Sequence, residues 1–228
     1  MTLAQALFIA AAIVAGPAAA APDPGPAPAQ AIVPPRLLLD YCQAAPRYCG
    51  VEPEADPAAA LPELNRRYWG AVRAVLADRA SAEITSASAS AVLPPGLRGE
   101  LGRVNDLVNG AMTQRADVDT YGKPDVWRAP SLSGSDVFGD CEDFVLKKRE
   151  MLIDAGAPPE ALAIALVRTP AGEPHAVLLV ATEDGVLALD NLEPEIRPWR
   201  DKALNWVQVQ RFGDLFDWRG EPEPSAAP

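Results

Sequence analysis

The sequence predicts an α+β fold in which helices come first and an antiparallel β-sheet follows. Three observations lead to this prediction. Apolar residues recur at helical spacing up to about residue 155, three short apolar runs follow, and Glu183-Asp184-Gly185 forms a turn signal between the last two runs. Helices followed by a series of strands are typical of an α+β domain. The length of 228 residues suits one compact domain with extensions.

Two segments precede the expected domain. Residues 1–21 combine an apolar stretch with a run of small residues, which predicts a secretory signal peptide. Because no Lys or Arg stands before the apolar stretch, an uncleaved anchor is the alternative. Residues 22–35 are mostly Ala and Pro and are expected to form an extended linker. The folded domain is expected to span residues 36–215, followed by a disordered tail at residues 216–228.

Two helices are expected in the first half of the domain. One covers residues 62–80, with Pro62 suited to its first turn, and the other covers residues 96–116. A polar stretch and two prolines separate them. The residues expected to face the core are Trp69, Val72, Leu76 and Ala80 in the first helix, and Leu97, Leu101, Val104, Val108 and Met112 in the second.

A third helix is expected at residues 141–155, and its boundaries are the best marked. Asp140 suits the N-cap, Asp143 follows three residues later, and Gly156 with two prolines behind it ends the helix. Its apolar residues are expected to pack on the sheet. The side chains expected to face solvent are Lys147, Lys148 and Arg149.

The strands of the sheet are expected at residues 162–169, 175–182 and 185–189, with a further strand at 206–212. His175 opens the second strand, and Asp190 directly follows the third. If these two strands pair through a tight turn, their far ends are neighbours. The sequence therefore predicts that His175 and Asp190 meet at one end of the sheet.

The cysteines and the single histidine predict nucleophilic chemistry. Cys42 and Cys49 are seven residues apart and would close a small disulfide loop in an exported protein, which leaves Cys141 unpaired. A thiol needs a base to become a thiolate, and the base needs an orienting partner. Cys141 stands where a loop turns into a helix, whose free N–H groups favour a thiolate. A buried, inert cysteine is the alternative.

The catalytic residues predicted from this reasoning are Cys141 as nucleophile, His175 as base and acid, and Asp190 as orienting carboxylate. Asn191 is the alternative orienting residue, because either residue type serves in related folds. Trp127 has two interpretations. Its indole N–H would help an oxyanion near the nucleophile, or its ring belongs to the core.

The net charge of the chain limits the kinds of molecule that the protein is expected to bind. The formal net charge is −11, and the first charged residue is Asp23, so this charge belongs to the chain after the predicted signal peptide. Nucleic acid is not expected as a partner, because no basic patch is present to neutralise phosphates. A negative chain attracts divalent cations or basic peptide segments instead.

Three segments carry a family resemblance: Gly139-Asp140-Cys141-Glu142-Asp143-Phe144, His175-Ala176-Val177-Leu178 and Leu189-Asp190-Asn191-Leu192. Together they resemble the bacterial transglutaminase-like cysteine proteinases, whose best-known members are periplasmic proteases of the LapG type. The resemblance covers about residues 36–212 and is far more specific than any one motif. It implies a papain-like or transglutaminase-like fold, with the nucleophile helix packed on an antiparallel β-sheet, and a Cys-His-Asp triad.

The resemblance also implies a function and partners. Proteases of this type cleave large cell-surface adhesins, require calcium, and are controlled by an inner-membrane receptor for cyclic di-GMP. The acidic residues that flank the family's cysteine match Asp140 and Glu142 here. Like-charge repulsion from them would raise the pKa of the Cys141 thiol, and a bound calcium ion would relieve it. The alternative is that both carboxylates only complement the helix start.

The expected protein is therefore a periplasmic cysteine peptidase with an adhesin-type protein substrate. Two alternatives remain open at this point. One is acyl transfer or amidase chemistry on cell-wall peptides with the same triad. The other is an inactive binding module in which the thiol is incidental.

Overall fold

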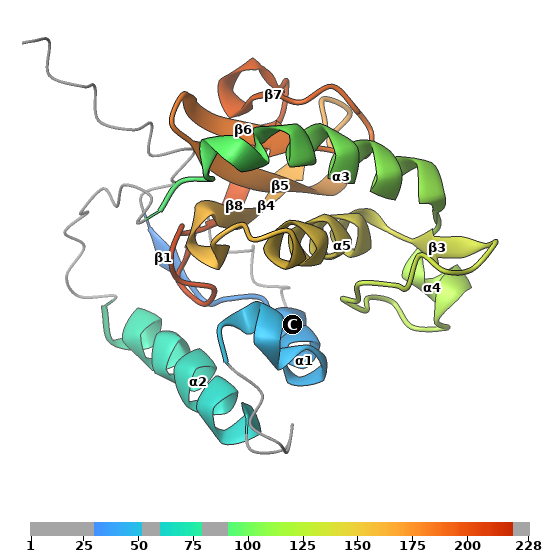
Figure 1. Ribbon diagram of the computed structural model, residues 1–228. Coiled ribbons are helices and arrows are strands. Elements are labelled where there is room, and N and C mark those ends of the chain that lie inside the picture. Colours follow the sequence, from blue (N-terminus) through green and yellow to red (C-terminus); the bar gives the residue numbers. More distant parts are fainter. Residues whose placement is uncertain (1–29, 52–59, 79–90, 221–228) are drawn as a thin grey trace, which may run out of the picture.

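The computed structural model describes residues 30–51, 60–78 and 91–220 (Figure 1). The expected signal peptide lies outside the described residues, as does most of the expected linker. Among the described helices, none has the length and apolar character that a membrane span requires.

Helices dominate the first part of the chain. The α-helices are α1 (Arg36–Ala44), α2 (Ala60–Asp78), α3 (Arg98–Ala111), α4 (Asp117–Thr120) and α5 (Cys141–Asp154). Short 3-10 helices are η1 (Pro46–Cys49), η3 (Pro95–Leu97), η4 (Pro159–Ala161) and η5 (Trp199–Asp201).

A seven-stranded sheet follows, in the order β1-β9-β8-β4-β5-β6-β7, and every pair in it is antiparallel. Its strands are β1 (Ala31–Ile32), β4 (Leu162–Arg168), β5 (Pro174–Thr182), β6 (Gly185–Leu189), β7 (Arg197–Pro198), β8 (Asn205–Gln210) and β9 (Trp218–Gly220). A separate parallel pair joins β2 (Met112–Gln114) to β3 (Val137–Gly139). The expected α+β fold is confirmed.

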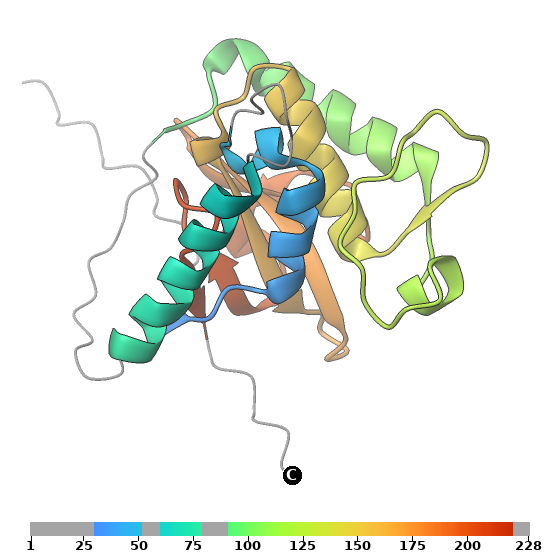
Figure 2. The ribbon, with the colours of Figure 1, turned by 90° about the horizontal axis from the view of Figure 1, so that it is seen from below.

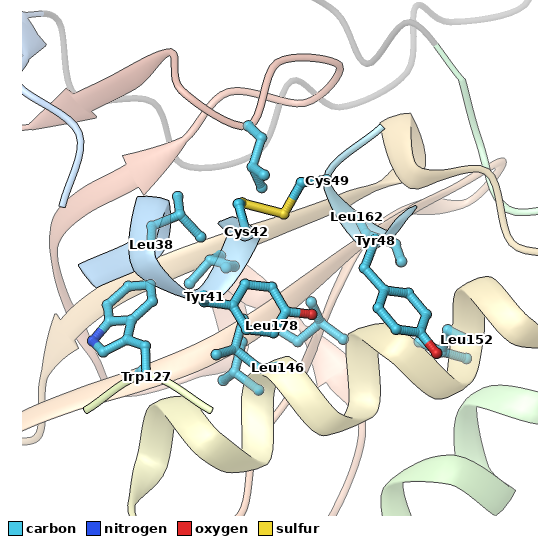
Figure 3. Packing of buried hydrophobic residues seen from close by; sticks show 14 of the residues in the cluster. Leu38, Tyr41, Cys42, Tyr48, Cys49, Trp127, Leu146, Leu152, Leu162 and Leu178 are labelled. Carbon is cyan, nitrogen blue, oxygen red and sulfur yellow. A yellow bond between two sulfur atoms is a disulfide. The ribbon is translucent and has the colours of Figure 1, made fainter. Parts of the chain in front are cut away.

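Helix α5 lies at the centre of the helical layer. It packs on β5 and beside α3, while α1 lies between α5 and α2 when the molecule is seen from below (Figures 1 and 2). On β5, Ala176, Leu178 and Val180 face the helices and join the larger buried cluster, whereas Val177 and Leu179 face the other side of the sheet. The disulfide between Cys42 and Cys49 ties α1 to η1 within the larger cluster (Figure 3).

The inward face of α2 differs from the prediction. Leu64, Tyr68 and Val72 are buried at a spacing of four residues, while Trp69 is 47% exposed and Leu76 is 58% exposed. Both sets share Val72 and both fit helical periodicity, so spacing alone could not choose between them. Tyr68 decides the face, because its ring packs on Phe216 and its hydroxyl donates to the Pro34 carbonyl oxygen.

Helix α3 ends earlier than predicted. It stops at Ala111, and the next three residues form β2 beside β3 instead of a further turn of helix. Four of the five residues expected to face the core are buried. These four are Leu101, Val104, Val108 and Met112.

Helix α5 begins at Cys141 as predicted, but its solvent face was predicted wrongly. Lys148 and Arg149 are buried, because α5 packs on β5 on one side and beside α3 on another, which leaves little of the helix exposed. The Arg149 guanidinium compensates by donating to the carbonyl oxygen of Tyr48.

Both predicted ends of the domain need correction. Ile32 is buried in β1, although it was assigned to the linker, and Phe216 and Trp218 are buried, although they were assigned to the disordered tail. The predicted boundaries followed from the composition of the linker and tail segments, which suggested that neither contributes to the core. The short strands β1 and β9 nevertheless form there, because a strand of two or three residues needs only one or two buried apolar side chains. Residues 221–228 of the predicted tail lie outside the described residues.

Candidate active site

The nucleophile candidate stands at the junction of β3 and α5. Gly139 ends β3, Asp140 occupies the N-cap position, and Cys141 is the first residue of the helix. A Cβ atom at Gly139 would lie 2.7 Å from the Asp143 Cβ and 2.9 Å from the Met112 Cε, so only glycine permits this tight junction. The junction presents the Cys141 side chain where the first N–H groups of α5 have no partner within the helix.

His175 and Asp190 meet at the end of the sheet that lies beside Cys141. Leu178 of β5 pairs with Leu189 of β6, which brings the two residues to neighbouring strand ends. Their side chains are almost fully buried, and the His175 Nε2 lies 2.8 Å from the Asp190 Oδ1. Because Nε2 is engaged, Nδ1 is the ring nitrogen available to a thiol.

Asp190 is held as a carboxylate by its surroundings. Burial works to raise its pKa, but the hydrogen bonds from His175 and from the Leu192 backbone N–H, together with the nearby Lys202 charge, outweigh burial and lower that pKa. Lys202 Nζ lies 3.6 Å from the Asp190 Oδ2. An ionised Asp190 can accept the Nε2–H of a neutral imidazole and stabilise an imidazolium.

Asn191, the alternative orienting residue, points elsewhere. Its Nδ2 donates to the Gln114 Oε1 at 3.0 Å, and the structure places no Asn191 contact on the His175 ring. The orienting position beside His175 is therefore filled by Asp190.

The turn after β6 is fixed by three side chains that the sequence reasoning did not assign. Asn109 Nδ2 donates to the Asp190 carbonyl oxygen at 2.9 Å, and Asn105 Nδ2 donates to the Pro194 carbonyl oxygen at 2.7 Å. Lys202 Nζ donates to the Glu193 carbonyl oxygen at 3.0 Å. The spacing of four residues between two asparagines on α3 was a usable signal, whereas Lys202 had none.

The Cys141 thiol is held protonated in this structure. Its Sγ donates to the Glu142 Oε2 at 3.0 Å, and among the described residues no hydrogen bond joins it to the His175 ring. Burial, followed by the negative charge of Glu142, raises the pKa of the thiol, while the Ala176 backbone N–H lowers it slightly. After burial, the charge of Glu142 is the largest influence against a thiolate, so offsetting this charge would favour the thiolate.

A cluster of carboxylates lies against the thiol. Asp117, Asp140 and Glu142 each offer an oxygen atom, and these atoms lie within 4.8 Å of one another. Burial raises the pKa of Asp140 to about 8 and that of Glu142 to about 7, with their mutual repulsion adding to the effect on Asp140. Asp140 and Glu142 were predicted as metal ligands from the sequence, and Asp117 was missed.

The cluster fits a hard cation. The Oδ1 atoms of Asp117 and Asp140 are buried without a hydrogen-bond partner, which is unfavourable unless a further group completes the site. Asp140 at the N-cap position makes no side-chain capping bond, so capping does not explain its carboxylate. Oxygen donors of this kind suit calcium, whereas zinc prefers nitrogen and sulfur.

Asp143 does not belong to this cluster. Its Oδ1 accepts the Arg128 backbone N–H at 2.8 Å, and its Oδ2 accepts the Tyr121 hydroxyl at 3.0 Å. Asp143 thus anchors the loop before β3 to α5. Trp127, in the same loop, is 7% exposed and belongs to the larger apolar cluster, which agrees with its interpretation as a core residue (Figure 3).

Comparisons with known proteins agree on one family. The family described as bacterial transglutaminase-like cysteine proteinase matches residues 77–220, a range that includes Cys141, His175 and Asp190. Among curated protein sequences, none matches this chain.

Three solved structures of Legionella pneumophila LapG are similar to the chain. One has a TM-score of 0.43 and 29% identity, covering 50% of this chain and 63% of that chain. The calcium-bound form has a TM-score of 0.45 and 28% identity, with coverage of 57% and 75%. An EGTA-treated form has a TM-score of 0.42 and 28% identity, with coverage of 50% and 62%.

Proposed function

Because this chain belongs to the bacterial transglutaminase-like cysteine proteinases, we propose that it is a calcium-dependent cysteine endopeptidase with Cys141, His175 and Asp190 as its catalytic triad. The observation that carries the proposal is the buried 2.8 Å contact between His175 Nε2 and Asp190 Oδ1 beside the thiol at the start of α5. It leaves one imidazole nitrogen for the thiol and fixes the tautomer that can accept a proton there.

The proposed reaction has two stages. His175 Nδ1 takes the Cys141 proton, and the thiolate attacks a peptide carbonyl, so that a C–S bond forms. The C–N bond then breaks and the amine leaves with the proton from His175. In the second stage His175 removes a proton from water, which hydrolyses the thioester and regenerates the thiol. The Cys141 backbone N–H, at the first position of α5, is placed to donate to the oxyanion.

Asp117, Asp140 and Glu142 are the residues proposed to hold calcium. The bound ion supplies positive charge that offsets three carboxylates next to the nucleophile. If Glu142 held a calcium ion, its charge on the Cys141 thiol would be offset, and the pKa of that thiol would be lower than in the ion-free site. The two unpartnered Oδ1 atoms support this part of the proposal.

The proposal extends to location and substrate. The predicted signal peptide and the disulfide between Cys42 and Cys49 support a periplasmic protein, because disulfides persist in oxidising compartments. The motifs around the triad support a protein substrate of the large repeat adhesin type, under control of an inner-membrane cyclic di-GMP receptor. Cleavage of such an adhesin would release it from the cell surface.

Alkylation of Cys141 tests the nucleophile without a known substrate. The rate of reaction with iodoacetamide is measured against pH, with calcium or with a chelator, in the wild type and in His175→Ala. We expect reaction well below pH 8.5, the usual pKa region of a free cysteine, in the wild type with calcium only. The proposal would be contradicted if the rates followed the titration of an ordinary thiol and were the same in His175→Ala and in chelator.

A further inference from the structure

A hollow of about 460 Å³ lies beside the candidate active site and has no role in the mechanism above. It opens between the segment that enters the domain, the loop before β3, and strands β4 and β8. The lining residues that matter here are Ile32, Val33, Asp125, Trp127, Leu166 and Gln208. Its walls are mainly apolar, and the polar residues among them are Gln30, Arg36, Asp125 and Gln208.

The hollow is connected to the nucleophile through a row of paired residues. Ala176 of β5 pairs with Leu166 of β4, which pairs with Gln208 of β8, so these side chains share the face of the sheet that carries the helices. Neighbouring strands lie about 4.8 Å apart, which places Gln208 about 10 Å from Ala176. Ala176 directly follows His175, the proposed base, so this row begins beside the reacting residues.

A second connection runs along the opposite wall. The Asp125 carboxylate lies close enough to Glu142 for its charge to act on that residue, and Glu142 accepts the Cys141 thiol. The hollow is therefore bounded on two sides by residues that lead toward the reacting sulfur, Leu166 through Ala176 and Asp125 through Glu142. Since an extended peptide advances about 3.3 Å per residue, 10 Å corresponds to about three residues.

Gln208 is the residue that indicates a ligand. Its side chain is only 8% exposed and lines the hollow, yet it makes no hydrogen bond to any residue in the described ranges. Gln210, two residues along the same strand, shows the ordinary arrangement, because its Oε1 accepts the Ile164 backbone N–H at 3.0 Å. The Gln208 amide faces the hollow instead of a protein partner, and its donor and acceptor together match a peptide group.

We propose that this hollow is a substrate subsite that binds an extended polypeptide about three residues from the scissile bond. Gln208 hydrogen-bonds the backbone of the substrate, while Ile32, Val33 and Leu166 take an apolar side chain. Asp125 at the rim disfavours an acidic side chain there. This inference rests on the proposed function, because it assigns the occupant of the hollow from the peptidase chemistry beside it.

The test compares two kinds of alkylating reagent on the calcium-loaded full chain. Iodoacetamide needs only the thiolate, whereas an epoxysuccinyl peptide also needs a place for its peptide. Two leucine-containing epoxysuccinyl tripeptides are used, one extending toward the acyl side of the scissile bond and one toward the leaving-group side, each with a glycine analogue. We expect one leucine reagent to react faster than its analogue.

The decisive variant is Gln208→Met, which keeps the length of the side chain and removes its hydrogen bonds. We expect the rate with the favoured leucine reagent to fall about threefold to tenfold, the value of one hydrogen bond. The rate with iodoacetamide should not change. Gln43→Met, the same exchange on α1 outside the hollow, should leave both rates unchanged.

Leu166→Ala is the second variant, in case Gln208→Met does not fold. It should reduce the leucine-to-glycine rate ratio while the iodoacetamide rate stays constant. Unchanged peptide rates in the folded variants, or equal losses with both kinds of reagent, would overturn the subsite. Failure of the proposed function is distinguishable, since the wild type would then lack calcium-dependent and His175-dependent alkylation by iodoacetamide.

Discussion

At the scale of single residues, Asp117 explains why part of the site could not be read from the sequence. It stands on the short helix α4, away from the motif around Cys141, and nothing in its own sequence surroundings marks a ligand. Asp140 and Glu142 were found because they adjoin the cysteine. Only the folding of the loop against α5 brings the third carboxylate within 4.8 Å of the other two.

Asp117→Asn is expected to weaken calcium binding by about tenfold or more, the effect usual for a disturbed ligand shell. Asparagine keeps an oxygen that can accept the Val126 backbone N–H, so the fold should persist. Isothermal titration with calcium gives the affinity. Asp119→Asn, an exposed carboxylate on the same helix, is the control, and an equal affinity loss in both variants would contradict the assignment.

Lys148 is another residue at which the sequence-based prediction and the structure disagree. Charge placed it on the solvent face of α5, but it is 1% exposed, and burial lowers its pKa to about 7 against the opposing pull of Asp190. Helical periodicity assumes one buried face, and α5 is buried on nearly all sides. A helix that is buried on nearly all sides is recognised from the sequence when it is apolar all round. The charged residues of α5 remove this signal.

At the scale of elements, proximity along the chain decided what was predictable. A turn signal predicts the hairpin of β5 and β6, so the meeting of His175 with Asp190 could be predicted. The start of α5 was predictable as well, because a cap residue and a stop signal mark the ends of this helix. The pairings of β2 with β3 and of β8 with β4 join distant segments, and no local pattern encodes them. The carboxylate cluster of Asp117, Asp140 and Glu142 and the hollow depend on such distant pairings.

The turn that carries Asp190 is the element most sensitive to a single substitution. Lys202→Met removes a buried ammonium group that contacts Asp190 and the Glu193 carbonyl oxygen. Loss of one partner of a buried ion pair is expected to lower the free energy of unfolding by about 3 kcal/mol. Urea unfolding measures this, with exposed Lys123→Met as the control.

The same variant has a readout specific to the site. His175 is the only histidine of the chain, so its ring nitrogens give unambiguous NMR signals. With the Asp190 turn loosened, the neutral ring should lose its preference for a proton on Nε2. A destabilised variant that retains the wild-type tautomer would show that Lys202 supports the fold without positioning Asp190.

At the scale of the whole molecule, stability should depend on pH and calcium together. Asp140 and Glu142 have pKa values of about 8 and about 7 in the fold, raised from the usual values near 4. A raised pKa adds stability that is present below about pH 4 and is lost as the pH rises through the folded values. Lys148 does not oppose this trend below about pH 7, because it is then charged in both states.

In chelator, the melting temperature should therefore be lower at pH 7.5 than at pH 5.5. Calcium should reduce this difference, since a ligand at a hundredfold excess over its Kd adds about 2.7 kcal/mol. Differential scanning calorimetry at both pH values provides the measurement, and magnesium at equal concentration serves as the control. A melting temperature that rises from pH 5.5 to 7.5 in chelator would contradict the assigned shifts.

The pairing of β1 with β9 has a consequence for how the protein is made. Ile32 pairs with Trp218, so the first strand of the sheet finds its neighbour only in the last described strand. During synthesis, this edge of the sheet cannot close until nearly the whole chain has left the ribosome. Contacts of such long sequence separation also form slowly. Such late closure agrees with the proposed export, in which the chain would cross the membrane before it folds.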